Sequence, residues 1–404
     1  MMETMMIGFS LIVAIGALAQ LFAWRFDLPA IIIMTVAGVL VGPIFGWIDP
    51  ESMLGDLYSP LISFAVALIL FEGSLGLEFR EIREYRKVIA RLVTIGVLLS
   101  FLATSVLLFT VGDIHWLPAL TLGALFVVTG PTVVIPLLRQ ANLVPHVANV
   151  LKWEGIIVDP IGALLGLFVV QFGFAFYQND SLTTHLPFLG SCLIGMALGI
   201  LFGVVLMRSF AKGRVPEYLQ TTLTLSGVLL VFSMSEWVMH EVGLLAVTAM
   251  GLTMANSKFA RPEILTHLRE FKENVSILLI SSVFIILTAS LSRTDLLAVL
   301  QAPILLSIAG LFLVRPFSIF SATIGTPLAR NERLFIGWIA PRGIVAMTVT
   351  GFFAAEITEL GVTDAEKMLP MTLGLVFLSV TIHGLTIKPL ARRLGLNKVK
   401  NPWS

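Results

Sequence analysis

The chain has 404 residues, of which 57% are hydrophobic and 13% are charged. Soluble domains carry about a quarter charged residues, so this composition excludes an ordinary soluble domain and indicates a polytopic membrane protein. The net charge of +1 says nothing about nucleic acid, because loops and a few buried groups set this balance rather than a basic face. We expect no nucleic-acid partner, and membrane lipids are the expected surroundings.

Apolar segments long enough for membrane-spanning helices of about 20 residues follow one another along the chain. Charged or Gly/Pro-containing links separate them, and hydropathy predicts about thirteen spans in an all-α fold. The segments are 5–23, 28–47, 60–78, 88–111, 117–139, 147–176, 187–207, 217–237, 242–256, 272–291, 296–324, 333–355 and 368–388.

The charges in the links predict the orientation of these segments. Links after odd-numbered segments are rich in Arg and Lys, as between residues 80 and 87, whereas links after even-numbered segments carry acids such as Asp49 and Glu51. Because positive residues stay on the cytoplasmic side, we expect the N-terminus outside and a short cytoplasmic tail at 389–404. The expected location is the cell (inner or plasma) membrane.

Two pairs of matching features, with almost the same number of residues between the members of each pair, predict an inverted repeat. Residues 35–40 resemble residues 248–253, an offset of 213, and the helix-breaking prolines Pro131 and Pro341 lie 210 residues apart. Seven segments separate the members of each pair, and an odd number reverses the direction through the membrane. Inverted repeats with one broken helix each are typical of secondary transporters, so segments 5 and 12 are expected to cross as broken helices.

The first break is expected to offer oxygen ligands. Pro131 and Pro136 each deny a helical amide to a preceding carbonyl, and Gly130 lets the backbone unwind. Freed carbonyls and the hydroxyls of Thr129 and Thr132 are the hard ligands that a small monovalent cation accepts. The alternative is a proline kink that serves only packing.

The second break contains a charge, because Arg342 lies between Pro341 and Gly343. Unwinding there would leave two half-helix ends with facing partial charges in low dielectric. A fixed guanidinium would compensate the exposed carbonyl end.

Segment 6 holds two acids at membrane depth, Glu154 and Asp159, and such residues usually mark ion pathways. Helix geometry separates them by about 140° around the axis and about 7.5 Å along it, so they need not share a partner. We assign Glu154 to Arg315 as a structural ion pair, which leaves Asp159 free to titrate. The alternative pairs Asp159 with Arg342 or Arg315 and would hold it deprotonated.

Glu72 and His383 are two further candidates for a functional role. Glu72 ends segment 3, either as an accessory acid at an ion funnel or as a plain interfacial acid, and His383 is either packed in its helix or tunes a pH response. No Walker loop, nucleotide fingerprint, hydrolase elbow or zinc motif appears in the sequence. We therefore expect no enzyme activity and no cofactor, with an ion gradient as the energy source.

Taken together, these residues resemble the monovalent cation:proton antiporters of the sodium/hydrogen exchanger superfamily, in its prokaryotic exchanger-type branch. The likeness covers essentially the whole chain and rests on Phe71-Glu72-Gly73, Thr129-Gly130-Pro131, Glu154 with Asp159, Arg315-Pro316, Pro341-Arg342-Gly343 and His383-Gly-Leu-Thr386. The resemblance implies that Asp159 is contested by cation and proton, that Thr129 helps to bind the cation, and that Glu154 pairs with Arg315.

The resemblance also implies an architecture for this single transmembrane domain of residues 1–404. A scaffold near 5–47 and 187–256 would form a homodimer, and a core near 60–176 and 272–388 would carry the site by an elevator motion. A cytoplasmic regulatory domain beyond the C-terminus of a longer native chain is a further possible partner.

Three positions depart from the pattern of the exchanger branch. That branch usually has Asn where this chain has Val158, Asp where it has Gly130, and Ser where it has Gly155. These departures leave the choice between Na⁺ and K⁺ open.

The expected activity is exchange of Na⁺ or K⁺ for H⁺ by competition at Asp159, one for one and electroneutral, with pH homeostasis as the expected role. Two alternatives stay open: a cation channel or efflux pore independent of protons, and a membrane cation or pH sensor that transports nothing.

Overall fold

A computed structural model of the chain describes residues 2–26, 28, 30–178, 186–260 and 262–397. The described residues are almost entirely helical, apart from one isolated antiparallel bridge between Leu143 and Asn397. The helices are α1 (Met2–Phe26), α2 (Ala30–Val39), α3 (Pro50–Leu54), α4 (Tyr58–Leu75), α5 (Arg86–Arg91), α6 (Val97–Thr110), α7 (Trp116–Leu125), α8 (Pro131–Ala141), α9 (Pro145–Gln178), α10 (Leu186–Ala211), α11 (Glu217–Val238), α12 (Val242–Asn256), α13 (Pro262–Ala289), α14 (Arg293–Ala298), α15 (Ala302–Ala322), α16 (Arg330–Trp338), α17 (Ile344–Glu359) and α18 (Met368–Arg393).

Every apolar segment predicted from the sequence falls on a helix or on two half-helices. Eight helices among the described residues are long and apolar enough to cross a membrane, and shorter apolar helices accompany them. Single π-helical turns, Leu40–Ile44 and Leu92–Gly96, extend α2 and join α5 to α6. The all-α polytopic fold is therefore as expected, whereas the number of spans stays a prediction.

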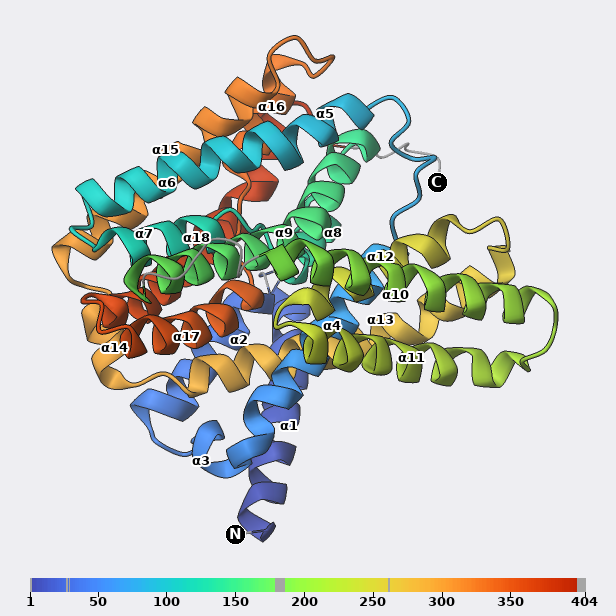
Figure 1. The fold of residues 1–404 in the computed structure, drawn as a ribbon, viewed down its shortest axis with the longest axis horizontal. Coiled ribbons are helices and arrows are strands. Elements are labelled where there is room, and N and C mark those ends of the chain that lie inside the picture. The colour runs from blue at the N-terminus through green and yellow to red at the C-terminus, as the bar shows by residue number, and fades with distance from the viewer. Residues whose placement is uncertain (1, 27, 29, 179–185, 261, 398–404) are drawn as a thin grey trace.

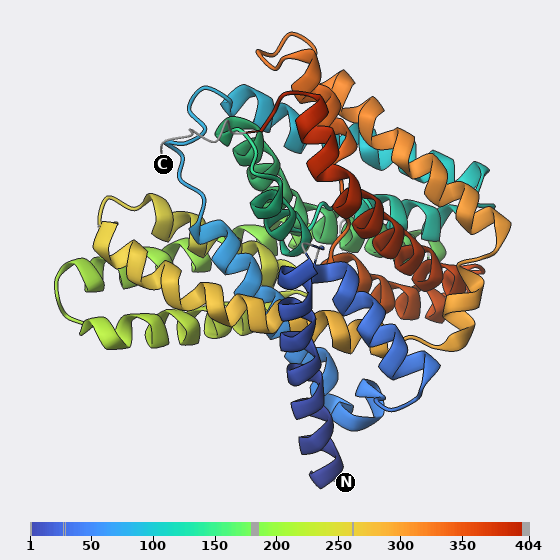
Figure 2. The ribbon, with the colours of Figure 1, turned by 180° about the vertical axis from the view of Figure 1, so that it is seen from behind.

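The helices pack into two bundles that meet along one seam (Figures 1 and 2). One bundle contains α1, α2, α4 and α10 to α13, and the other contains α6 to α9 and α15 to α18. The seam is formed where α9 and α17 pack against α12, α13 and α4. The expected division assigned segments 60–78 and 272–291 to the core, whereas the corresponding helices, α4 and α13, pack in the first bundle. Which helices move together stays a prediction.

The two six-residue stretches that resemble each other make matching close contacts. A Cβ atom on Gly38 of α2 would lie 1.9 Å from the hydroxyl oxygen of Thr288 in α13. The corresponding Cβ on Gly251 of α12 would lie 1.9 Å from the hydroxyl oxygen of Ser74 in α4. Glycine thus lets α2 approach α13, and α12 approach α4, as small residues do at helix contacts in membranes. The contacts agree with an inverted repeat, which itself stays a prediction.

Two membrane helices are interrupted near the middle of the second bundle, at the positions of the predicted breaks. Residues 126–130 leave the helix between α7 and α8, and residues 339–343 leave it between α16 and α17. Pro131 begins α8, a position where its missing amide costs nothing. The unwound stretch therefore precedes Pro131. Pro136, the second proline expected to weaken the helix, lies inside α8, which continues through it.

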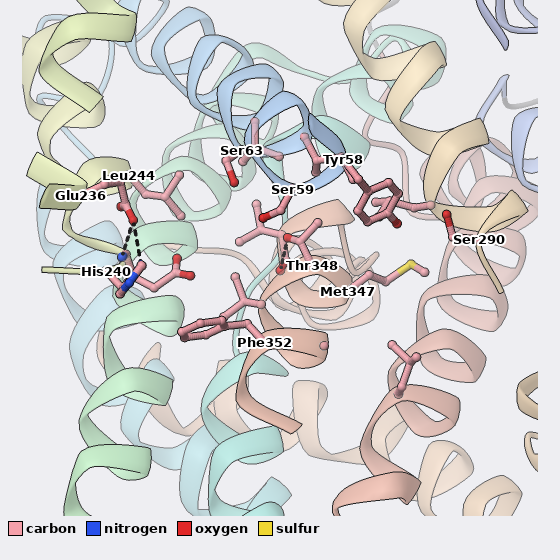
Figure 3. Close-up of a pocket in the computed structure, with 18 of the residues that line it drawn as sticks. Tyr58, Ser59, Ser63, Glu236, His240, Leu244, Ser290, Met347, Thr348 and Phe352 are labelled. Atoms are coloured by element: carbon pink, nitrogen blue, oxygen red, sulfur yellow. Dashed lines mark hydrogen bonds and ion pairs between the residues drawn. The ribbon is translucent and has the colours of Figure 1, made fainter. Parts of the chain in front are cut away.

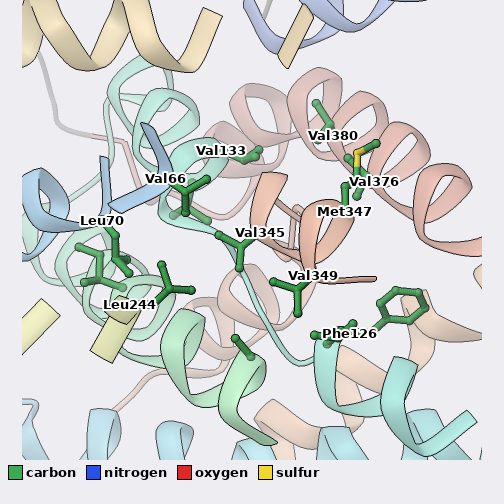
Figure 4. Packing of buried hydrophobic residues seen from close by; sticks show 14 of the residues in the cluster. Val66, Leu70, Phe126, Val133, Leu244, Val345, Met347, Val349, Val376 and Val380 are labelled. Atoms are coloured by element: carbon green, nitrogen blue, oxygen red, sulfur yellow. The ribbon is translucent and has the colours of Figure 1, made fainter. Parts of the chain in front are cut away.

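A continuous apolar core surrounds both breaks. Val66 and Leu70 of α4, Leu244 of α12 and Val345 of α17 converge in the same region as Phe126 at the first break (Figure 4). These side chains come from both bundles, so the core closes the seam as well as each bundle. In a bilayer such packing is stabilised by van der Waals contact between the helices rather than by removal of apolar surface from water.

Candidate cation site

Asp159 lies on one stripe of α9 together with three glycines, because residues 155, 159, 162 and 166 recur at helical spacing. A Cβ on Gly155 would lie 2.7 Å from the carbonyl oxygen of Thr129, and a Cβ on Gly162 would lie 3.1 Å from that of Ala124. The glycines flanking Asp159 therefore bring α9 against the first break, and Asp159 stands between these two contacts.

The Asp159 carboxylate is withdrawn from water and lacks a partner among the residues that the structure describes. The residue is 1% exposed, and neither carboxylate oxygen accepts a hydrogen bond from any described residue. An unpartnered carboxylate in low dielectric is costly, and a bound cation or proton removes that cost. Asp159 as the ion-binding group stays a prediction, and its burial without a partner agrees with that role.

Thr129, the predicted cation ligand at the first break, is also buried, at 2% exposure. Its carbonyl faces Gly155 of α9, one helical turn before Asp159. Oxygen atoms of the break and the carboxylate thus belong to the same contact between α9 and the α7–α8 link. Thr132, the other predicted hydroxyl ligand, lies outside the residues whose side chains are described.

Arg342 lies in the second break and forms hydrogen bonds with the first break. Its Nη1 atom donates to the carbonyl oxygens of Val127 at 3.1 Å and Val128 at 2.8 Å, and its amide donates to the Ser379 hydroxyl at 3.1 Å. The carbonyls belong to the unwound stretch after α7, where the partial charge of a helix end is negative. The guanidinium thus compensates the carbonyl end of the other broken helix, 214 residues away in sequence.

Glu154 and Arg315 form a bidentate ion pair inside the second bundle. Both terminal nitrogens of Arg315 donate to the carboxylate, with Nη2 2.7 Å from Oε2 and Nη1 bonded to Oε1. The two side chains are 4% and 7% exposed. The pair links α9 to α15, and Asp159 takes no part in it. Neither arginine therefore holds Asp159, which removes the alternative pairing considered from the sequence.

The other residues considered from the sequence lie elsewhere. Glu72 lines a small pocket with residues of α11 and α13, such as Thr224 and Ser276, and its role as an accessory acid stays a prediction. His383 is 2% exposed and packs against the rings of Phe312 and Trp338, with centroid distances of 5.5 and 5.9 Å. His383 is thus a packed helix histidine.

A comparison with known protein families identifies the family of the chain that holds this site. The profile described as "Sodium/hydrogen exchanger, transmembrane" matches residues 10–393, almost the whole chain. The chain belongs to the sodium/hydrogen exchanger family. Its breaks, its buried Asp159 and its Glu154–Arg315 pair all lie within the matched region.

Named relatives of this exchanger-family chain include sodium and potassium antiporters. It is 24% identical over 383 residues to Na(+)/H(+) antiporter 1 of Methanocaldococcus jannaschii, covering 91% of this chain and 87% of that protein. It is also 24% identical over 401 residues to the K(+)/H(+) antiporter NhaP2 of Shewanella oneidensis, covering 97% of this chain and 67% of that one. The solved structure of the sodium proton antiporter MjNhaP1 from M. jannaschii superimposes with a TM-score of 0.82 at 21% identity, over 97% of this chain and 99% of that chain.

A cavity of about 490 Å³ lies at the seam of this exchanger-family fold, and no motif in the sequence predicts it. Glu51 and Glu241 are among the residues that line it. Tyr58, Glu236 and His240 also belong to the lining (Figure 3). They come from links and helix ends that the charge pattern places on the outer side. Of these residues only Glu51 is named from the sequence, as an acid of an outer link, because no local pattern indicates that they converge.

Proposed function

We propose that this protein is a secondary antiporter that exchanges a monovalent cation, Na⁺ or K⁺, for H⁺ at Asp159. One observation carries the proposal: a carboxylate at 1% exposure, without a protein partner among the described residues, beside the unwound carbonyls of a broken helix. Such a group can hold a cation or a proton but not both at once. Competition between the two ions couples their movements.

Backbone oxygens would complete the cation site. The exchanger branch usually supplies side-chain oxygens where this chain has Val158, Gly130 and Gly155. The close approach at Gly155 supports the carbonyl of Thr129 as a ligand in place of those side chains, together with the Asp159 carboxylate. Relatives named for Na⁺ and for K⁺ are both similar to this chain, so both ions are proposed substrates.

The proposed stoichiometry is one proton for one cation. Glu154 is neutralised by Arg315, and Arg342 is committed to the carbonyls of the first break, which leaves one free carboxylate in the site. An uncompensated charge would move against about 2.3 kcal/mol for each 100 mV of membrane potential. A neutralised site avoids this cost. We further propose an elevator motion of one bundle against the other, within a homodimer.

The test is exchange in proteoliposomes with Asp159→Asn. We expect the variant to fold like the unmodified protein and to lose exchange of Na⁺ and K⁺ against an imposed pH gradient. Asp56→Asn, at an exposed acid of the outer link, is the matched control and should exchange normally. Undiminished exchange by the Asp159 variant would refute the proposal.

The two rival functions give different results in the same assay. A channel would pass cations without proton counterflow, and a sensor would bind a cation without any uptake. Flux of Na⁺, K⁺ and Li⁺ compared across pH in the unmodified protein separates all three.

A further inference from the structure

The seam cavity lies on the side of the fold that the charge pattern predicts to be outside. Its lining comes from both bundles: α4, α11, α12 and α13 on one side and α17 on the other. Val66, Leu244 and Val345 are apolar parts of this lining, and they lie close together in the core (Figure 4). Asp159 does not line the cavity. A proton that moves between the cavity and Asp159 has to cross this boundary, and a titratable group in the lining would provide an intermediate acceptor for it.

Three carboxylates line the cavity, and two of them are unsuited to that task. Glu51 lies in the first turn of α3 and is exposed. Glu236 is committed to the start of α12, because its carboxylate accepts the amides of Glu241 at 3.2 Å and Gly243 at 2.9 Å and lies 3.6 Å from Nδ1 of His240. Free amides at a helix start require such an acceptor. Figure 3 shows Glu236 and His240 joined in this way.

Glu241 is the third carboxylate, and its side chain is not engaged. It is half-buried and lines the cavity, yet its carboxylate forms no hydrogen bond or ion pair with any residue that the structure describes. Its backbone is left-handed, with φ of 67°, an unusual conformation for a residue with a side chain. These residues also do not form a metal site, since no cluster of three ligand side chains occurs in the described part of the chain.

Glu241 is electrostatically coupled to the proposed ion site. The charged groups that act on it are Glu236, Asp159 of α9 and Glu356 of α17. Desolvation raises the pKa of Glu241 to about 8, and repulsion from these three carboxylates adds to the effect. His240, Glu51 and Tyr58 share the cavity, whereas α10, which packs along α12, has no acidic or basic residue before Arg208.

We propose that Glu241 transfers protons between the outer cavity and Asp159, an inference that rests on the proposed exchange. As a cation leaves for the cavity, the O–H bond of Glu241 breaks and its proton passes through intervening water to the carboxylate of Asp159, where a new O–H bond forms. Cavity water then returns a proton to Glu241. The reverse sequence carries a proton outward, so the step balances in both directions.

The experiment uses right-side-out membrane vesicles that contain the full chain, with the outer pH varied from 6 to 10 at saturating Na⁺ or K⁺. In the unmodified protein, proton delivery should decline above about pH 8, where Glu241 loses its proton. Glu241→Gln should slow exchange about tenfold or more, since a positioned proton-transfer group contributes at least this much, and should remove the decline. Glu241→Asp should keep the decline at a lower pH.

The controls separate the failure of this inference from the failure of exchange. Glu51→Gln, at an exposed acid of the same cavity, should behave like the unmodified protein, and inside-out vesicles should show an unchanged dependence on inner pH. No exchange by the unmodified protein overturns the proposed function. Normal exchange by Glu241→Gln, or a uniform loss that keeps the outer pH profile, overturns the role of Glu241 alone.

Discussion

The Glu154–Arg315 pair offers the sharpest test of how this protein is stabilised. Both oxygens and both terminal nitrogens are engaged, the side chains are 4% and 7% exposed, and Arg315 Nε has no partner among the described residues. Glu154→Gln would leave the guanidinium buried without a counterion. Breaking one side of a buried pair costs about 3–5 kcal/mol. We expect a loss within this range, because both side chains are almost fully buried.

The double variant Glu154→Gln with Arg315→Met removes both charges. Replacing a whole buried pair by uncharged groups is often close to neutral, so the double variant should recover most of the loss. The expected coupling between the two sites is at least about 2 kcal/mol, within the range seen for groups in one network. If the pair is only structural, the double variant should also recover cation:proton exchange.

The assay is the free energy of unfolding in mixed detergent micelles, followed by tryptophan fluorescence. Trp153 is 2% exposed and precedes Glu154, so it reports on this region. The reasoning would be refuted if a single variant lowered the free energy of unfolding by less than about 1 kcal/mol. It would also be refuted if the losses of the two single variants simply added in the double variant. A stable double variant without exchange would show that the pair also acts in transport.

Two further predictions concern the breaks. Arg342→Gln should lose both charge-assisted hydrogen bonds to the first break, each of which contributes about 1.5–3 kcal/mol. The variant should therefore have a lower midpoint of thermal unfolding and a lower exchange rate. Normal values of both quantities would contradict the compensating role of Arg342. Gly155→Ser should displace the carbonyl of Thr129, because the new Cβ would lie 2.7 Å from its oxygen. We expect the apparent cation affinity to fall several-fold. An unchanged affinity would exclude that carbonyl as a ligand.

Much of the fold could be predicted from the sequence. Hydropathy places helices along the chain because lipid requires every backbone polar group to be satisfied within its own segment. The prolines at 131 and 341 indicated the breaks through local chemistry alone, and the burial of Asp159 followed from its position in an apolar run. The profile match agrees with the family that these motifs had indicated.

The partners within the site were decided only by the tertiary structure. Two deep acids and two deep arginines allowed several pairings, and the fold brings Arg315 of α15 to Glu154 of α9, at a sequence separation of 161. Arg342 reaches the carbonyls after α7 only because the two breaks meet. The unwound residues precede Pro131 because that proline can begin a helix.

Local sequence therefore determined which residues leave water and where helices stop. Which buried groups meet was determined by contacts between segments far apart in the chain, since charge and hydrogen bonding in low dielectric depend on a few ångströms of separation. The convergence of Glu236, His240 and Glu241 on one cavity is of this second kind.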